Sequence, residues 1–483
     1  MYKGAQGMLT VRSTILTAFI AAVLVVICAS PLFAGTVNRP HPSTLTYHPL
    51  KITRPDVIEI SLDNGLEGFF IEDHEIPEVT VTLLVKTYFP DQEKYGLNAM
   101  ARWVMRNGGT KTWPPDKLND ELEFRAASVW VYGGNLSTYV TFNCLKKDLA
   151  VVLEIFADLV MNPAFPRNKI TLKRKTTLED IRRRNDYPDS VARREFYDLI
   201  YKDHPYGLET PKSSVKAITR KDLVGFHKRY FHPNTAIIGI SGDVTKDEII
   251  DALNSALKGW EPAEVVIPEV PEIGEKAGQS YHYIYKDVNQ AYIMIGHLGI
   301  NVNNPDRCAL NIMNFILGGD FTSWITQKVR SDEGLAYSAG SSFGSDSWTK
   351  GIFRAYAQTK ADAYSRSLKL IIEQIERMRD EGPTEEELRK AVDSFLNSQA
   401  FNYESKGHVV HRLIRLRYQD RPLDSLERDM EAYARLTLED IKRVAREYLH
   451  PDKLTVLVVG DADLFDRPLS EFGQVNVIKI EEE

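Results

Sequence analysis

The feature that most constrains this 483-residue chain is an internal repeat. Residues 219–243 (TRKDLVGFHKRYFHPNTAIIGISGD) and 437–461 (TLEDIKRVAREYLHPDKLTVLVVGD) align along their whole length without a gap. Each copy opens with Thr-x-x-Asp before a helical pattern, and a proline then precedes an apolar run of strand type. Copies this far apart exclude a solenoid and predict two homologous domains. The identical pairs are Thr219/Thr437, Asp222/Asp440, Tyr230/Tyr448, His232/His450, Pro233/Pro451, Gly242/Gly460 and Asp243/Asp461.

A linker is expected between the two copies. Pro262, Pro268 and Pro271, together with several glutamates, interrupt all periodicity there, which is typical of a semi-extended connection. The interpretation therefore divides the chain into residues 1–34, an N-terminal domain over 35–260, a linker over 261–278 and a C-terminal domain over 279–483.

Residues 1–34 have the pattern of a targeting segment. Lys3 and Arg12 precede an uncharged, mostly apolar run over residues 15–34 that ends in small residues. This order predicts a secretory signal peptide with cleavage after Ala34, and export to the periplasm or an equivalent compartment. The alternative is an uncleaved membrane anchor formed by residues 15–34, because a run of this length just spans a bilayer.

The amino-acid composition limits the classes of partner that are expected. The formal net charge is −7 and no extended basic block occurs, so nucleic acid is not expected as a partner. Three cysteines do not make a disulfide scaffold. Strand and helix patterns alternate in an order that favours α+β over doubly wound α/β. Strands are expected over 58–62, 66–71 and 79–86 and around Gly133-Gly134, with a hairpin turn at Asp63-Asn64-Gly65. Helical patterns are expected over 97–106, 117–127, 147–161, 169–184, 308–317 and 321–330, and Thr384 with Glu387 predicts a capping box that opens a further helix.

Two short motifs suggest chemistry but have simpler interpretations. Gly340-Ser341-Ser342-Phe343-Gly344 matches the G-x-S-x-G pattern of a nucleophile elbow, which requires a helix after the serine. The residues that follow predict a turn and another strand instead. His408 and His411 share one helix face, as zinc ligands do, but no carboxylate pattern completes a site. We expect them to be surface or packing residues.

Four segments in a fixed order resemble the M16 peptidase family, which includes insulinase, pitrilysin and the mitochondrial processing peptidase. The resemblance spans roughly residues 55–475. It implies an α+β chain of two homologous M16-type (LuxS/metallohydrolase-like) domains, each a mixed, mainly antiparallel sheet with packed helices. The segments are LDNGLEGFFIEDHEIPEVTV, KYGLNAMARWVMRNGGTKT, DHPYG and ILGGDFTSWITQKVRSDEGLAYS.

The resemblance also identifies where catalytic residues would stand. Active members have H-x-x-E-H on a helix and a distant glutamate, which together bind zinc and activate its water. The matching positions here are Ala99, Arg102 and Trp103, with Asp180 at the position of the distant glutamate. Because these residues do not form a zinc site, no metal is expected in this chain. The simplest interpretation makes Trp103 a packing residue, Arg102 a surface or ion-paired residue and Asp180 an ordinary helix charge.

The second half retains more of the family pattern. Arg330 and Tyr337 match the pair that family members use to hold substrate, and Gly318 and Gly319 match a glycine-rich loop able to approach a peptide. An arginine fork suits a peptide carbonyl or carboxylate, and a tyrosine hydroxyl suits an oxyanion. The alternative is an exposed Arg330 paired with Asp332 or Glu333, and a tyrosine packed at the start of a strand.

Lost zinc ligands together with a retained Arg/Tyr pair imply the non-catalytic subunit of a two-subunit M16 peptidase. In this hypothesis a partner subunit with H-x-x-E-H holds the zinc, and the complex acts on a peptide or an unfolded protein. Two alternatives remain: a peptide-binding or scaffold protein without peptidase activity, and a self-sufficient zinc peptidase with non-standard ligands. A membrane is a partner only if the N-terminal segment is uncleaved.

Overall fold

The structure is a computed structural model that describes residues 55–90, 92–274, 278–403 and 405–480. The predicted signal peptide over 1–34, and the alternative anchor over 15–34, lie outside these residues. Within the described ranges, no helix has both the length and the apolar character needed to cross a bilayer. The described residues all belong to one structural unit.

The first half of the chain forms a six-stranded sheet with the order β1-β2-β6-β3-β5-β4. Its β1–β2 hairpin turns at Asp63-Asn64-Gly65, as predicted: Gly65 has a φ of +80°, and the Asn64 side chain accepts from the Leu66 N–H at 3.1 Å. The strands are β1 (Ile58–Ser61), β2 (Glu67–Glu72), β3 (Glu78–Lys86), β4 (Ser128–Gly133), β5 (Ser137–Leu145) and β6 (Ala236–Gly242).

The second half repeats this arrangement in a sheet with the order β10-β12-β8-β13-β7-β14. In the first sheet β6 lies between parallel β2 and antiparallel β3, and in the second β13 lies between parallel β7 and antiparallel β8. The structure therefore confirms two homologous domains with mixed, mainly antiparallel sheets. The strands are β7 (Ser280–Tyr285), β8 (Gln290–Leu298), β10 (Ala336–Phe343), β12 (Ile352–Lys360), β13 (Thr455–Gly460) and β14 (Val475–Val477).

Helices pack against both sheets, and several begin at the caps that the sequence predicted. Thr219 and Thr437, one in each repeat copy, both form reciprocal capping boxes with an aspartate at the third helical position, and Thr384 does so with Glu387. The helices of the first half are α2 (Leu97–Gly108), α3 (Pro115–Phe124), α4 (Leu149–Met161), α5 (Arg167–Arg182), α7 (Lys212–Ala217), α8 (Arg220–Tyr230) and α9 (Lys246–Ala256). Those of the second are α10 (Arg307–Asn314), α11 (Tyr364–Asp380), α12 (Glu385–Ser398), α14 (Ser425–Ala434) and α15 (Leu438–Tyr448).

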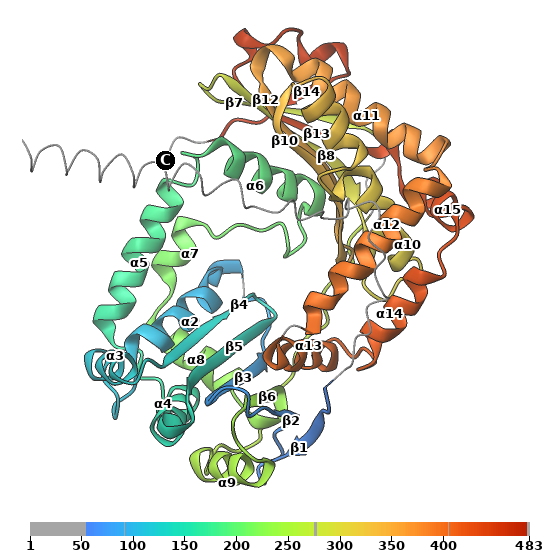
Figure 1. Ribbon diagram of the computed structural model, residues 1–483. Helices are drawn as coiled ribbons and strands as arrows, with labels where there is room; N and C mark the ends of the chain where they lie inside the picture. Colours follow the sequence, from blue (N-terminus) through green and yellow to red (C-terminus); the bar gives the residue numbers. More distant parts are fainter. Residues whose placement is uncertain (1–54, 91, 275–277, 404, 481–483) are drawn as a thin grey trace, which may run out of the picture. The chain divides into compact units, whose positions relative to one another are not determined.

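Two further helices are exchanged between the halves. Helix α6 (Pro188–Tyr201) packs on β8 and β13 of the second sheet, whereas α13 (Lys406–Tyr418) packs on β2 and β6 of the first. Figure 1 shows green α6 beside the yellow-to-red strands and orange α13 beside the blue-green ones. The two helices begin at equivalent positions of the repeat, since Pro188 precedes Lys406 by the same offset that separates Thr219 from Thr437. The exchange is therefore reciprocal.

The sequence places apolar residues at matched positions of these helices. Phe196 of α6 lies in a buried cluster with Leu457 of β13, and Ile414 of α13 lies in one with Ile237 of β6. Gly239 permits the second contact, since a Cβ there would lie 2.3 Å from a Val410 methyl. Each sheet is therefore completed by a helix from the other half of the chain.

Candidate functional site

Helix α2 carries the positions where active relatives would bind zinc. Ala99, Arg102 and Trp103 line one groove of about 720 Å³, and its opposite wall is the edge strand β4. The structure thus brings these three predicted positions together. The remaining lining residues are Arg106, Asn107, Asn119, Ala127, Ser128, Val129, Trp130, Val131, Tyr132, Gly133 and Lys173.

Arg102 is folded inward at this groove. Its side chain is 8% exposed, and Nη1 donates to the carbonyl oxygen of Gly134, just after β4, at 2.5 Å. Burial lowers the pKa of Arg102 to about 10, so the guanidinium stays charged at neutral pH. The prediction of a surface or ion-paired Arg102 was wrong. This face of α2 lies against the end of β4, where the carbonyl of Gly134 accepts the hydrogen bond.

Arg106, one helical turn further along α2, makes a similar connection. Its Nε donates to the carbonyl of Val129 in β4 at 2.6 Å, and Nη1 donates to Asn119 of α3 at 3.0 Å. Burial lowers its pKa as well. Two arginines therefore tie α2 to the edge strand. Sequence analysis missed Arg106, although the i, i+4 spacing from Arg102 was a usable signal.

The other positions of the lost zinc pattern have separate roles. Trp103 packs against the first hydrophobic core, which confirms the packing interpretation, and Lys173 Nζ lies 5.8 Å from its ring centre. Asp180 is exposed on α5 and does not line the groove. Across the described ranges, no cluster of three or more His, Cys, Asp or Glu side chains is arranged to hold a metal ion.

In the second half, Arg330 and Tyr337 lie together with Phe321. The guanidinium carbon of Arg330 is 4.5 Å from the ring centre of Phe321 and 6.0 Å from that of Tyr337. Both rings are largely exposed, at 65% for Phe321 and 79% for Tyr337. We call these three residues the Arg330 cluster. It is a cation held between two accessible aromatic side chains.

The alternative interpretation, an ion pair of Arg330 with Asp332 or Glu333, is not found among the described residues. Glu333 instead accepts from Arg366 at 2.7 Å and pairs with Lys328 at 3.4 Å. No carboxylate of the described part of the chain is paired with Arg330. Its guanidinium donors are therefore not committed to an internal acid.

The backbone around the Arg330 cluster departs from the predicted helices. The helix predicted over 321–330 begins after Ser323 and continues as a π-helix over Thr326–Asp332. Asp320 explains the late start, because its carboxylate accepts from the N–H of Thr322 at 2.9 Å and so forms a turn. Phe321 lies in that turn, which exposes it, and sequence analysis missed it for this reason.

The two predicted glycines lie just before this turn, in a π-helical segment over Phe315–Gly319. Gly318 is buried, and a Cβ there would lie 2.3 Å from the Ser341 hydroxyl of β10. The absence of a side chain at Gly318 therefore allows the π-helical segment to pack closely against β10. Gly319 is exposed, and a Cβ there would lie 2.8 Å from the Asn314 amide nitrogen.

The remaining motifs have structural roles. Ser342 lies in β10, where its hydroxyl accepts from Arg354 at 3.0 Å, and β11 (Ser345–Asp346) and β12 follow. This confirms a strand and turn rather than a nucleophile elbow. His411 of α13 stacks on Tyr139, with ring centres 5.3 Å apart, and burial lowers the pKa of His411.

Comparison with known proteins identifies the family. The model of the insulinase family (peptidase family M16) matches residues 72–213, and that of the peptidase M16 inactive domain matches residues 217–395. The chain belongs to the M16 peptidase family.

Relatives carry two kinds of name. An uncharacterized zinc protease of Rickettsia bellii is 26% identical over 67% of this chain and 79% of its own length. The non-peptidase homolog YmxG of Helicobacter pylori is 24% identical over 77% of this chain and 86% of its own.

Solved structures confirm the fold. A peptidase M16 inactive domain from Pseudomonas fluorescens superposes with a TM-score of 0.78 at 23% identity, covering 86% of this chain and all of that one. A protease from Helicobacter pylori gives 0.75 at 20% identity, covering 84% of this chain and all of that one. These structures share the fold of this chain, in which Ala99, Arg102 and Trp103 occupy the positions that match the family's zinc motif.

Proposed function

We propose that this chain is the non-catalytic subunit of a two-subunit M16 peptidase. A partner subunit with H-x-x-E-H supplies the zinc site, and this chain supplies peptide-binding residues. The observation that carries the proposal is the contrast between two arginines. Arg102 binds the chain's own backbone at the position that matches the zinc motif, whereas Arg330 lies against two exposed rings and is paired with no acid of the described ranges.

The Arg330 cluster has the chemistry to hold an extended peptide. A guanidinium presents several donors in a plane and binds a carbonyl or carboxylate with two parallel bonds. Phe321 and Tyr337 add accessible apolar surface, and the tyrosine hydroxyl adds a donor. Aromatic and arginine side chains are also enriched in protein recognition surfaces.

Export to the periplasm is part of the same proposal. It is supported by the sequence of residues 1–34, in which a positive start, an apolar run and a small-residue end follow one another. Fusion of these residues to a reporter that is active only after export tests this part separately. Retention of the reporter in the cytoplasm would contradict it.

The experiment combines the mature chain with an H-x-x-E-H subunit from the same genome and measures peptide hydrolysis. We expect Arg330→Ala to lower kcat/KM about tenfold or more, because a charge-assisted contact to the substrate is lost. Tyr337→Phe tests the hydroxyl alone. Arg389→Ala, an exposed arginine of α12, is the matched control and leaves hydrolysis unchanged.

Unchanged hydrolysis by both Arg330→Ala and Tyr337→Phe would overturn the substrate-binding assignment. Failure of the two subunits to associate would instead favour the second candidate, a peptide-binding or scaffold protein that works without a peptidase. The likeness to a non-peptidase homolog supports that candidate. Zinc analysis of the purified chain tests the third: one zinc per chain would indicate a self-sufficient peptidase.

A further inference from the structure

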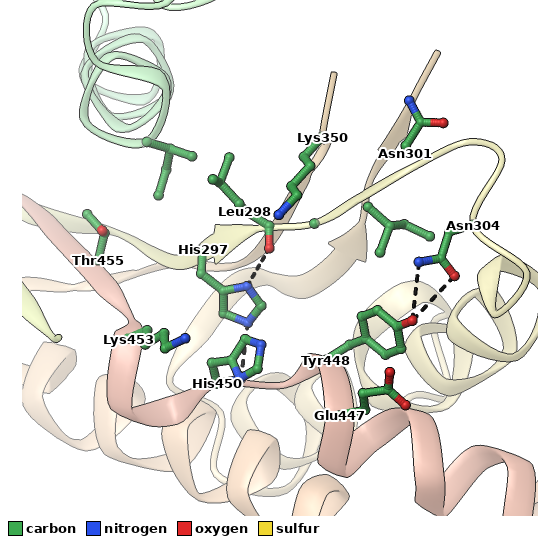
Figure 2. Close-up of a pocket in the computed structure, with 13 residues that line it drawn as sticks. His297, Leu298, Asn301, Asn304, Lys350, Glu447, Tyr448, His450, Lys453 and Thr455 are labelled. Carbon is green, nitrogen blue, oxygen red and sulfur yellow. Dashed lines mark hydrogen bonds between the residues drawn. The ribbon is translucent and has the colours of Figure 1, made fainter. Parts of the chain in front are cut away.

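One pocket of the second half, of about 390 Å³, has polar side chains that are engaged within the chain itself, and Figure 2 shows hydrogen bonds among them. His297 donates to the carbonyl of Leu298 at 2.7 Å and accepts from the backbone N–H of His450 at 3.3 Å. Lys350, His450 and Lys453 each have further interactions within the chain. The charged groups of this pocket therefore serve the fold.

A different pocket, of about 380 Å³ on helix α13, is lined by an excess of basic side chains. Three arginines and two histidines face a single carboxylate there. We call it the basic pocket, and these residues are His408, His411, Arg412, Arg415, Arg421 and Asp429.

The sequence around the end of α13 explains why these side chains gather. His411 and Arg415 are four residues apart, so they lie on one face of the helix. Asp420, with a φ of +51°, then ends the helix, and the N–H of Arg421 donates to the carbonyl of Leu416 at 2.9 Å. This turn brings Arg421 back to the same pocket.

The positive charge of the basic pocket is not balanced by acids of the described ranges. Asp429 already accepts from Arg307, and the Arg421 guanidinium lies 3.7 Å from it. Burial, together with the charge of Arg307, lowers the pKa of Arg421. Arg412 donates to a backbone carbonyl at 3.5 Å, and the exposed Arg415 side chain has no hydrogen bond or ion pair with any described residue. The pocket therefore suits an anion.

A second pocket of about 380 Å³ adjoins the basic pocket, since Arg415 and Gln419 line both. The ring of His411, in the first, stacks on that of Tyr139, in the second, with centres 5.3 Å apart. We call the second one the aromatic pocket, because its wall includes Phe89, Tyr139, Tyr206, Trp348 and Tyr418.

The polar groups of the aromatic pocket are largely committed to the fold. The hydroxyl of Tyr418 donates to the carbonyl of Leu136 at 2.5 Å, and that of Tyr206 donates to Asp346 at 2.9 Å. Asp346 also accepts from the backbone N–H of Trp348 at 2.9 Å. The rings of Trp348 and Tyr418 are 5.2 Å apart. This wall therefore offers ring surface to an apolar or aromatic group.

We propose that the two pockets together bind the C-terminal residue of a peptide, with its α-carboxylate in the basic pocket and a large apolar or aromatic side chain in the aromatic pocket. A C-terminal residue carries both groups on one Cα, so it suits two pockets that meet at Arg415. A guanidinium binds a carboxylate with two parallel hydrogen bonds. An inorganic anion would fill the basic pocket alone. The inference rests on the proposed function for its class of ligand, a peptide.

The test uses the mature chain alone and a short peptide that carries a fluorophore at its N-terminus and ends in phenylalanine. We expect saturable binding by fluorescence anisotropy. The C-terminal amide of the same peptide should bind about tenfold more weakly, because a charge-assisted pair is lost. Arg415→Gln should weaken binding of the acid about tenfold and leave binding of the amide unchanged. Replacing the terminal phenylalanine by glycine should weaken binding about fivefold, as should Trp348→Ala.

Arg428→Gln is the matched control, because this exposed arginine of α14 lines neither pocket, and it leaves binding unchanged. Circular dichroism checks that each variant is folded. Equal binding of the acid and the amide would overturn the proposal, and so would unchanged binding by Arg415→Gln. Displacement of the peptide by inorganic phosphate, with no preference among C-terminal residues, would assign the basic pocket to inorganic anions and also overturn it.

Failure of this site and failure of the proposed function are distinguishable. If the chain does not associate with an H-x-x-E-H subunit, the two-subunit proposal fails, while the difference between acid and amide is still measured on the chain alone. If the complex hydrolyses peptides but the acid and the amide bind equally, only the C-terminal site fails.

Discussion

The two halves of this chain have the same strand arrangement but use arginine in opposite ways. In the first half, Arg102 is buried and gives its donor to the backbone carbonyl of Gly134. In the second half, Arg330 lies against the exposed rings of Phe321 and Tyr337, while neighbouring Glu333 is bonded elsewhere. An arginine whose guanidinium donates to the chain's own backbone has a structural role, whereas one without such an internal acceptor is available to a ligand.

The largest expected effect comes from the helix exchange that joins the halves. Phe196→Ala in α6 should lower the free energy of unfolding by about 3–5 kcal/mol, because a fully buried ring leaves a cavity against the second sheet. Ile414→Ala in α13 should cost about 2–5 kcal/mol against the first sheet. Urea unfolding measures both changes.

Phe124→Ala is the matched control, since this ring is 84% exposed at the end of α3 and should change stability by less than about 0.5 kcal/mol. If both halves unfold in one transition, the two core variants shift the same midpoint. Costs below about 1 kcal/mol for both would show that the exchanged helices do not hold the halves together.

This exchange also marks the limit of what the sequence could predict. The repeat, the first hairpin and the caps at Thr219 and Thr384 follow from local rules of turns and helix ends, and all are found in the structure. Apolar periodicity shows that a helix has a buried face, but not which sheet that face contacts. The reciprocal packing of α6 and α13 could therefore not be predicted.

The same limit applies to the candidate site. The resemblance to the M16 family located Ala99, Arg102 and Trp103, and the structure places them in one groove. The inward orientation of Arg102 depends on the carbonyl of Gly134, which lies far from it in the sequence. Phe321 was missed because the Asp320 turn that exposes it interrupts a pattern that otherwise predicts a continuous helix.

The next largest effect is a loss of folding stability at acidic pH, to which one buried histidine in each half contributes. Burial lowers the pKa of His297 in the second half, and of His227 in the first, to about 4. The unfolded chain takes up these protons near pH 6.5. Stability is therefore complete above about pH 6.5 and falls toward pH 4, by up to about 3 kcal/mol for the buried His297.

Urea unfolding at several pH values between 7 and 4.5 measures this loss. His297→Gln removes the titrating group, so the fall in stability with decreasing pH should become shallower. His227→Gln should make the pH dependence shallower to a similar extent, because burial lowers the pKa of that residue to about 4 as well. An unaltered pH dependence in His297→Gln would contradict a neutral His297 in the folded chain.

A smaller change, at Arg102, tests the contrast between the two arginines directly. Arg102→Ala should lower the free energy of unfolding by about 1.5–3 kcal/mol, because a charged hydrogen bond to a backbone carbonyl is lost. It should leave peptide hydrolysis by the complex unchanged below the unfolding temperature. Arg330→Ala should instead lower peptide hydrolysis and leave the free energy of unfolding within about 0.5 kcal/mol of that of the natural chain.

Arg102→Lys keeps the charge but loses the planar fork, so its stability should lie between those of the natural chain and Arg102→Ala. Loss of hydrolysis in a stable Arg102 variant would place this arginine in contact with substrate, and the contrast would fail.

The smallest expected effect concerns Phe321, the member of the Arg330 cluster that sequence analysis missed. Phe321→Ala removes the closer of the two rings that face the Arg330 guanidinium, at 4.5 Å. An exposed cation–π contact contributes about 0.5–1 kcal/mol, so KM for a peptide should rise about two- to fivefold with little change in kcat. Phe321→Tyr keeps the ring and should restore the natural KM. Because Phe321 is 65% exposed, unfolding should be unaffected. A fall in stability without a change in KM would make Phe321 a structural residue and leave Arg330 and Tyr337 as the whole of the peptide contact.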